Sequence, residues 1–305
     1  MLSKLNGLIA APFTPMQPDG SLNLSAIKDY YALLKRNGVN GAFIAGSTGE
    51  GPSLTLEEKI LLLDAWAQAT NADPDFHVIT LVGGTCIADC IHLAKEVEAR
   101  DLYGIAFTAP YYFKPASPHV LAELCRKIAA SVPKTTFYYY HIPVLNGCNI
   151  AMYDLLKSID GSIPNFGGIK YTHEDFMDFE SCMNIENGRY NMLWGRDENM
   201  LSSLPLGTKT AIGSTYNYAA PLYKDMITAF DQGDLQRAAS LQQKSIDMIR
   251  LLGKYGGIAT GKAYMKLIGL DCGEFRLPIT NMNQEAFESF KKDAQAIGFD
   301  TFKSS

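Results

Sequence analysis

The chain has 305 residues, of which 47% are hydrophobic and 19% charged, an ordinary enzyme composition with ample material for a large core. Its net charge is −5, from 27 basic and 32 acidic residues without a basic cluster, so nucleic acid and anionic membranes are poor candidates as partners. The N-terminal stretch has no signal-peptide core and no run reaches transmembrane length, so we expect a cytoplasmic protein.

Cysteine and histidine are too scattered to indicate a disulfide framework or a metal site. No Cys-x-x-Cys pair occurs, which is typical of reduced thiols in a cytosolic protein. The five histidines show no metal-ligand spacing with cysteine or carboxylate, so the sequence predicts no metal.

Short β-rich runs alternate with amphipathic helical stretches along the chain. The predicted strands are 7–11, 41–45, 77–82, 103–107, 136–140, 166–170, 191–194 and 210–213. The predicted helices include 24–35, one opened by the capping box Thr55 to Glu58, 88–99, one opened by Pro118, 152–158, 173–184, 198–204 and 218–230. The C-terminal part reads as helices only, over 235–252, 260–268 and 284–296.

Eight strand–helix units predict an α/β fold, a (β/α)₈ TIM barrel, whose usual length of about 250 residues fits this part of the chain. A doubly wound sheet is the structural alternative, but it normally has fewer strands and a glycine-rich fingerprint after the first one. No linker rich in Pro, Gly or Ser precedes the last helices. We therefore divide the chain into a catalytic barrel over 1–231 and a three-helix extension over 232–305 that packs on it.

In this barrel, active sites form at the C-terminal ends of the strands. The residues at those positions include a lysine, phenols, hydroxyls and two carboxylates. They lie in the segments 46–51, 108–112, 140–141, 170–172, 195–198 and 213–215.

Lys170 closes the apolar run 166–169, where an ammonium ion is poorly solvated. Because desolvation favours the neutral amine, the pKa of Lys170 should fall, and a neutral amine near pH 7 can attack a ketone to form a Schiff base. A lone lysine at a strand end more often reaches into water. Tyr140 ends the preceding strand, where a phenol can relay protons, whereas we assign Tyr138 and Tyr139 to the core.

Two other strand ends carry groups that could bind a substrate. The segment Gly46–Glu50 offers backbone amides with the hydroxyls of Ser47 and Thr48, a nest suited to a carboxylate or phosphate, although an ordinary turn would look similar. Asp197 and Glu198 could accept hydrogen bonds from a polyol. They could equally be a charge pair at a helix N-terminus.

Three motifs in this order resemble the dihydrodipicolinate synthase / N-acetylneuraminate lyase family of pyruvate-dependent class I aldolases, over essentially the whole chain. The residues 46–50 resemble its pyruvate-carboxylate loop, 140–143 its catalytic tyrosine segment and 168–170 its Schiff-base strand. The resemblance implies a Schiff base on Lys170, with Tyr140 relaying protons with the help of Ser47. It also implies that no metal or organic cofactor is needed and that the protein is a homotetramer.

Within this family, the sugar-binding segments are more similar to the branch that cleaves sialic acid into N-acetylmannosamine and pyruvate. The synthase branch carries an arginine shortly after its Tyr-x-x-Pro segment, and residues 144–147 contain no cation. Tyr112 matches a tyrosine that the synthases supply across a subunit interface. The resemblance implies substrate-binding roles for Ser47, Thr48, Thr172, Gly195, Asp197, Glu198, Gly213, Ser214 and Tyr112.

Three alternatives remain at this point. The chain could be a Schiff-base lyase for another 2-keto-3-deoxy sugar acid, or a dihydrodipicolinate synthase-like condensing enzyme. It could also be a ligand-binding paralogue without catalysis, against which the presence of both Lys170 and Tyr140 argues.

Overall fold

Eight parallel strands close into a barrel in this computed structural model, which describes residues 4–305. Each strand pairs with the next, and the last pairs with the first, so an open doubly wound sheet is excluded and the predicted (β/α)₈ barrel is confirmed. The strands are β1 (Gly7–Ala10), β2 (Gly41–Ile44), β3 (His77–Leu81), β4 (Gly104–Phe107), β5 (Thr136–His141), β6 (Phe166–Tyr171), β7 (Asn191–Trp194) and β8 (Thr210–Gly213).

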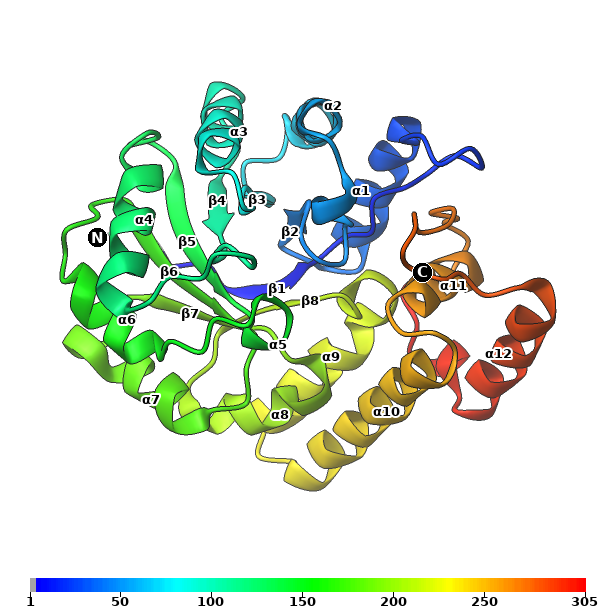
Figure 1. The fold of residues 1–305 in the computed structure, drawn as a ribbon. Helices are drawn as coiled ribbons and strands as arrows, with labels where there is room; N and C mark the ends of the chain where they lie inside the picture. Colours follow the sequence, from blue (N-terminus) through cyan, green and yellow to red (C-terminus); the bar gives the residue numbers. More distant parts are fainter. Residues whose placement is uncertain (1–3) are drawn as a thin grey trace.

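Residues 1–3 lie outside the described residues. They belong to the predicted barrel unit 1–231 and to the N-terminal stretch in which we expect no signal peptide. Twelve α-helices follow or flank the described strands (Figure 1). They are α1 (Ile27–Arg36), α2 (Leu56–Thr70), α3 (Ile87–Ala99), α4 (Pro118–Ala129), α5 (Pro143–Asn146), α6 (Met152–Ile159), α7 (Phe176–Asn184), α8 (Met200–Ser203), α9 (Tyr216–Asp231), α10 (Leu235–Lys254), α11 (Ala259–Leu267) and α12 (Gln284–Ala296).

The predicted helix starts at α2 and α4 are confirmed. The side-chain oxygen of Thr55 accepts from the backbone N–H of Glu58, and the backbone N–H of Thr55 donates to the carboxylate of Glu58. The two bonds satisfy two otherwise unpaired donors at the start of α2. Pro118 is the first residue of α4, where a missing N–H costs nothing, and Ser117 caps that helix.

Two predicted helices differ from the structure. The start at His173 was wrong, because Asp175 caps α7 by accepting from the N–H of Asp178 at 3.0 Å. The predicted helix 198–204 is instead three short turns, the 3₁₀ helices Asp197–Asn199 and Leu204–Leu206 with α8 between them.

The buried side chains form two layers because successive strand residues point to opposite faces. Those that face outward meet the helices and make the main core. Those that face inward fill the barrel, among them Ile9, Phe43, Tyr138, Leu193 and Ile212. Tyr139 lies in the outer layer and Tyr138 in the inner one, so both belong to the core as predicted.

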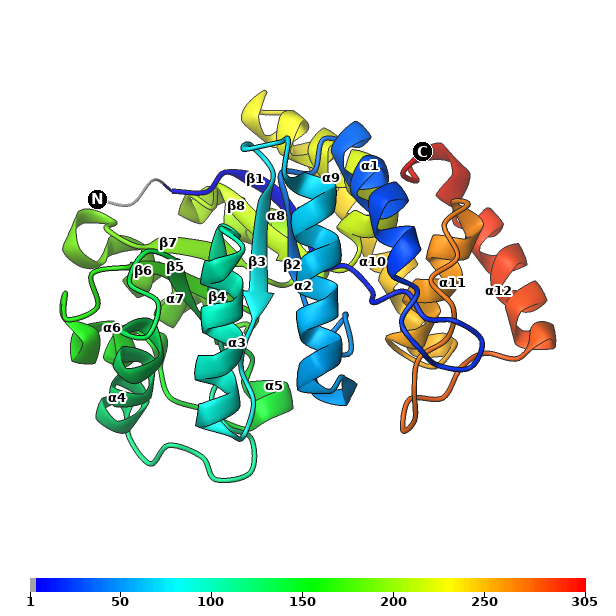
Figure 2. The ribbon, with the colours of Figure 1, turned by 90° about the horizontal axis from the view of Figure 1, so that it is seen from above.

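Helices α10, α11 and α12 follow the barrel and lie together on one side of it, where α10 and α11 contact α9 (Figures 1 and 2). The chain end returns to the barrel helices, where Ser304 N donates to Tyr218 O at 2.8 Å. The division at residues 231 and 232 into two units stays a prediction. Among the described residues, no helix combines the length and apolar character that crossing a membrane requires.

Candidate active site

Lys170 reaches the barrel interior because β6 contains an irregularity at its two glycines. Phe137 pairs with Phe166 but Tyr138 pairs with Gly168, so the register shifts by one residue between them. Gly168 has a φ of +151°, and a Cβ there would lie 1.9 Å from the carbonyl oxygen of Asn191, so only glycine fits. After this shift Lys170 stands opposite Tyr140 on the neighbouring strand.

The amine of Lys170 is buried between two aromatic rings. Lys170 is only 4% exposed, and its Nζ is 4.0 Å from the ring centroids of both Phe43 and Tyr140. Burial lowers the pKa of Lys170 to about 7, although the negative charge of Asp197 acts in the opposite direction. A large fraction of the amine is therefore neutral near pH 7 and able to attack a carbonyl carbon.

Tyr140 keeps its phenolic proton at neutral pH. Burial raises its pKa to about 12, whereas the nearby hydroxyls of Ser47 and Thr172 favour the phenolate and limit the rise. The ring packs edge-on against Phe43 at 5.4 Å between centroids, which fixes its orientation. A protonated phenol beside a neutral amine can pass protons in either direction.

The loop after β2 presents Ser47 and Thr48 at the strand end. The chain turns sharply there, because Ala45 and Glu50 adopt left-handed conformations with φ of 52° and 58°, and Gly51 N donates back to Gly46 O at 3.0 Å. Within residues 4–305 the backbone N–H groups of Ser47 and Thr48 donate to no acceptor. Two free amides with two hydroxyls beside them make a suitable cradle for a carboxylate.

Asp197 is a buried carboxylate with one oxygen bonded and one unpaired. Its Oδ2 accepts from the N–H and the hydroxyl of Thr215, at 3.0 and 2.6 Å. Its Oδ1 is buried and has no hydrogen-bond partner among the described residues. Burial raises the pKa of Asp197 to about 6, and the two bonds from Thr215 oppose that shift. The side chain therefore does not cap its helix and instead offers a free acceptor.

Thr172 follows β6 and Gly195 follows β7, and the two residues lie close together. The hydroxyl of Thr172 is buried without a partner among the described residues, and a Cβ at Gly195 would lie 2.0 Å from it. Only glycine at 195 thus leaves the Thr172 hydroxyl in its place. Glu198 is more exposed and pairs with Arg196 at 3.0 Å, and Arg196 also pairs with Glu174.

The comparisons with known proteins agree over nearly the whole chain. The family model described as the dihydrodipicolinate synthetase family matches residues 4–297. The N-acetylneuraminate lyase of Gallus gallus is 37% identical over 298 residues, which cover 96% of each chain. The chain belongs to the dihydrodipicolinate synthetase family.

Two solved structures resemble this chain in both fold and sequence. The N-acetylneuraminate lyase of Proteus mirabilis has a TM-score of 0.94 and 39% identity, covering 97% of this chain and 100% of that one. The corresponding lyase of Aliivibrio salmonicida has a TM-score of 0.94 and 34% identity, covering 98% of both chains.

Most residues that the family resemblance selects come together at one end of the barrel. Lys170 and Tyr140 are in contact, Ser47 and Thr172 flank the phenol, and Asp197 is close enough to influence the charge of Lys170. Ser214 follows β8, and its partly exposed side chain stands next to Thr215 in the chain. Tyr112 differs, because it is 76% exposed and packs edge-on against Phe113 instead of joining this cluster.

Two contributors were missed by the sequence reasoning. Phe43 covers the amine of Lys170 from another strand, and nothing in its local sequence distinguishes it from other core residues. Thr215 holds Asp197, and the available signal was a second hydroxyl directly after Ser214 at the end of β8.

Proposed function

We propose that this chain is an N-acetylneuraminate lyase, which cleaves sialic acid reversibly into N-acetylmannosamine and pyruvate through a Schiff base on Lys170. The observation that carries the proposal is a lysine with a pKa of about 7, buried against the ring of a tyrosine at the catalytic end of the barrel. The similar proteins from Gallus gallus and Proteus mirabilis are N-acetylneuraminate lyases, which supports the same activity here.

The covalent steps start at the neutral amine. Nζ of Lys170 attacks the C2 ketone of the open-chain sugar acid, and loss of water gives a protonated imine that draws electrons from the C3–C4 bond. Removal of the C4 hydroxyl proton breaks that bond, releases N-acetylmannosamine and leaves an enamine on Lys170. Protonation of the enamine at C3 and hydrolysis of the resulting imine release pyruvate and restore the amine.

Tyr140 moves the C4 proton in this scheme. Its phenol is protonated in the free site, because its pKa is about 12. The imine places a fixed positive charge near the ring, which lies 4.0 Å from Nζ of Lys170, and this charge favours the phenolate. Tyr140 then passes its own proton toward Ser47 and the substrate carboxylate as it accepts the one from the C4 hydroxyl.

The two ends of the substrate have separate binding groups. The amides and hydroxyls of Ser47 and Thr48 hold the carboxylate of the pyruvate part. The opposite rim holds the polyol chain, with the unpaired Oδ1 of Asp197 and the unpaired hydroxyl of Thr172 as acceptors or donors for its hydroxyls. The other residues assigned to this rim are Gly195, Glu198, Gly213 and Ser214.

Borohydride reduction in the presence of pyruvate tests the chemistry directly. We expect a stable adduct on Lys170 alone, located by mass mapping, and no adduct in Lys170→Arg, because a guanidinium stays protonated and forms no imine. Labelling of Lys209 or Lys114 instead would overturn the assignment. Release of N-acetylmannosamine from sialic acid then tests the substrate, and imine formation without this release would indicate another 2-keto-3-deoxy sugar acid.

We also propose that the protein is a cytoplasmic homotetramer. All six cysteines are free, which suits a reducing compartment such as the cytoplasm.

The proposed subunit contact involves two neighbouring segments at one end of the barrel. Asn146 Nδ2 donates to Thr108 Oγ1 at 2.8 Å, so α5 lies beside the β4–α4 loop. Large apolar side chains of these two segments are exposed, and such patches mark subunit contacts. They are Tyr111, Tyr112, Phe113, Val144 and Leu145. Sedimentation of the protein and of Phe113→Asp tests this, with dissociation expected for the variant.

A further inference from the structure

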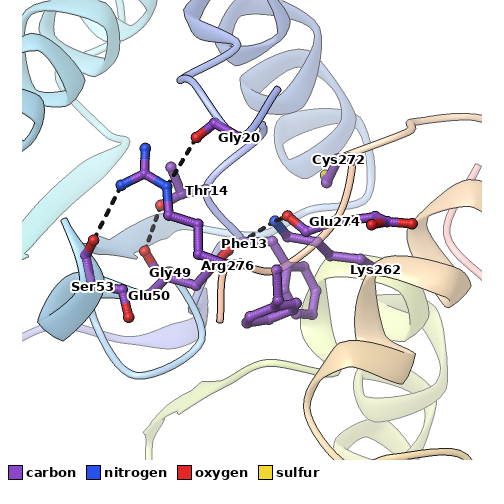
Figure 3. A network of polar contacts seen from close by, with 12 residues as sticks. Phe13, Thr14, Gly20, Gly49, Glu50, Ser53, Lys262, Cys272, Glu274 and Arg276 are labelled. Atoms are coloured by element: carbon purple, nitrogen blue, oxygen red, sulfur yellow. Dashed lines mark hydrogen bonds and ion pairs between the residues drawn. The ribbon is translucent and has the colours of Figure 1, made fainter. Parts of the chain in front are cut away.

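A buried ion pair joins the C-terminal helices to the loop that carries Ser47 and Thr48. Lys262 on α11 donates from Nζ to Oε1 of Glu50 at 2.8 Å, and the two side chains are only 3% and 4% exposed (Figure 3). The pair lies beneath an aromatic ring, because Nζ of Lys262 is also 4.6 Å from the ring centroid of Phe275. Shielding from water makes the position of each partner depend strongly on the other.

The second oxygen of Glu50 is held by the same part of the chain. Oε2 accepts from the backbone N–H of Arg276 at 2.9 Å, and Lys262 also donates to the carbonyl of Glu274 at 2.9 Å. The guanidinium of Arg276 then reaches the loop itself, where it donates to Ser53 O at 3.1 Å (Figure 3). Both carboxylate oxygens of Glu50 are thus fixed by residues 262–276.

These contacts restrain a strained turn. Glu50 has a left-handed backbone conformation that a residue with a side chain rarely adopts. A Cβ at Gly51 would lie 1.9 Å from the carbonyl oxygen of Ala45, so the two ends of the turn are in close contact. Ser47 and Thr48 lie inside this closed turn, and a shift of Glu50 moves the segment in which their amides are placed.

The geometry points to Lys262 as a positioning residue, which fixes the carboxylate cradle at Ser47 and Thr48 through Glu50. The C-terminal helices are then part of the pyruvate site and not only a cover for the barrel. A purely structural contact at this place would not need charges, because well-packed apolar residues often replace a buried ion pair without loss of stability. This inference rests on the proposed function for the identity of the ligand as pyruvate.

Lys262→Met tests the inference, since it keeps the packing volume and removes the charge. We expect the pyruvate concentration that half-saturates borohydride labelling of Lys170 to rise by about 10- to 100-fold, because small displacements of a binding group cost this much. The labelling rate at saturating pyruvate should change little, since Lys170 is untouched. Amide hydrogen exchange of residues 45–51 should become faster in the variant.

Two control variants separate positioning from stability. Lys266→Met lies one turn further along α11, where Lys266 is 54% exposed and pairs with Asp271 at 3.6 Å, and it should leave half-saturation and loop exchange unchanged. Phe290→Leu removes buried packing in α12 and should lower the melting temperature without changing half-saturation. An equal rise of half-saturation in Phe290→Leu would overturn the inference.

The remaining outcomes are also decisive. If folded Lys262→Met keeps both wild-type half-saturation and wild-type loop exchange, Lys262 has no positioning role. If Lys262→Met does not fold, the double variant Glu50→Gln/Lys262→Met removes both charges, and the same rise is expected there. If the unaltered protein is not labelled with pyruvate, the proposed function fails, and the exchange of residues 45–51 still decides the role of Lys262.

Discussion

Gly213 and Asp197 share a space that holds only one side chain. A Cβ on Gly213 would lie 1.8 Å from Oδ1 of Asp197, the carboxylate oxygen that has no partner among the described residues. The absence of a side chain at the end of β8 therefore allows the carboxylate to turn into the site while Thr215 holds its other oxygen.

Gly213→Ala should displace the carboxylate of Asp197. We expect kcat/KM for sialic acid cleavage to fall by about 10- to 100-fold, because a binding group moved by about 1 Å costs this much. Labelling of Lys170 with pyruvate and borohydride should continue, since the cradle at Ser47 is untouched. Gly253→Ala is the control, because a Cβ there meets nothing within 4 Å, and it should keep full activity. Full activity in Gly213→Ala would contradict the role given to Asp197.

The pH dependence of imine formation should follow the amine of Lys170. With a pKa of about 7, the neutral fraction rises through pH 7 and falls about tenfold for each pH unit below it. Because the charge of Asp197 raises this pKa, Asp197→Asn should move the midpoint of pyruvate labelling to lower pH. The labelling rate measured from pH 5 to 9 checks both statements, and a midpoint near pH 10 would show an ordinary lysine.

The same burial makes Lys170 costly for stability at low pH. Its pKa is lowered in the folded state, so the folded protein binds fewer protons than the unfolded chain between about pH 7 and 10.5. The penalty is complete below pH 7 and disappears as pH rises through that window. Lys170→Met should thus be more stable by up to about 5 kcal/mol at pH 6, with a smaller gain at pH 9. Denaturant unfolding of both proteins measures it, and a gain that grows with pH would reverse the sign.

Tyr140→Phe keeps the ring over Lys170 and removes the phenol. Loss of a general acid–base group typically lowers the rate by about 10² to 10⁴, so we expect kcat for sialic acid cleavage to fall within that range. Pyruvate labelling of Lys170 should remain detectable, because the amine keeps its burial. Tyr139→Phe, in the outer core layer, is the matched control. Cleavage at the wild-type rate in Tyr140→Phe would place the proton transfer on another group.

Local patterns predicted the strands and their order well. The buried strands are apolar runs bounded by polar turns, and the predicted spans 191–194 and 210–213 coincide with β7 and β8. The short helix α5, Pro143–Asn146, was missed because four residues carry no periodicity. The eight-unit pattern then predicted that Lys170 and Tyr140 share one end of the barrel.

Contacts between distant parts of the chain were not predictable in the same way. At the register shift in β6, the carbonyl of Asn191 on the next strand leaves room only for glycine at position 168. The spacing of residues within β6 does not predict this contact. Glu50 looked like the end of an anion-binding loop, whereas its side chain is paired with Lys262, 212 positions away in the sequence. Such pairings depend on how the helices pack, which a single sequence does not encode in its short-range pattern.

The two carboxylates on the rim should differ under mutation. Asp197 is buried with a free oxygen, whereas Glu198 is more exposed and already paired with Arg196. Leaving a substrate hydroxyl without its charged acceptor costs about 1–3 kcal/mol, so Asp197→Asn should lower kcat/KM for sialic acid by roughly 5- to 150-fold. Glu198→Gln should have a smaller effect, because the carboxylate of Glu198 is already paired with Arg196 and is less available to a substrate hydroxyl. Pyruvate labelling at pH 9 should be unchanged in both.

Glu174→Gln is the control for the rim pair, since Glu174 also contacts Arg196 and has no assigned substrate contact. It should keep the wild-type kcat/KM, which separates loss of a substrate contact from disturbance of Arg196. If Asp197→Asn and Glu198→Gln both keep wild-type kinetics and lose only thermal stability, the carboxylates are structural. A polyol-binding rim is the feature that distinguishes a nine-carbon substrate from a shorter keto acid, so that result would favour a lyase for the shorter acid.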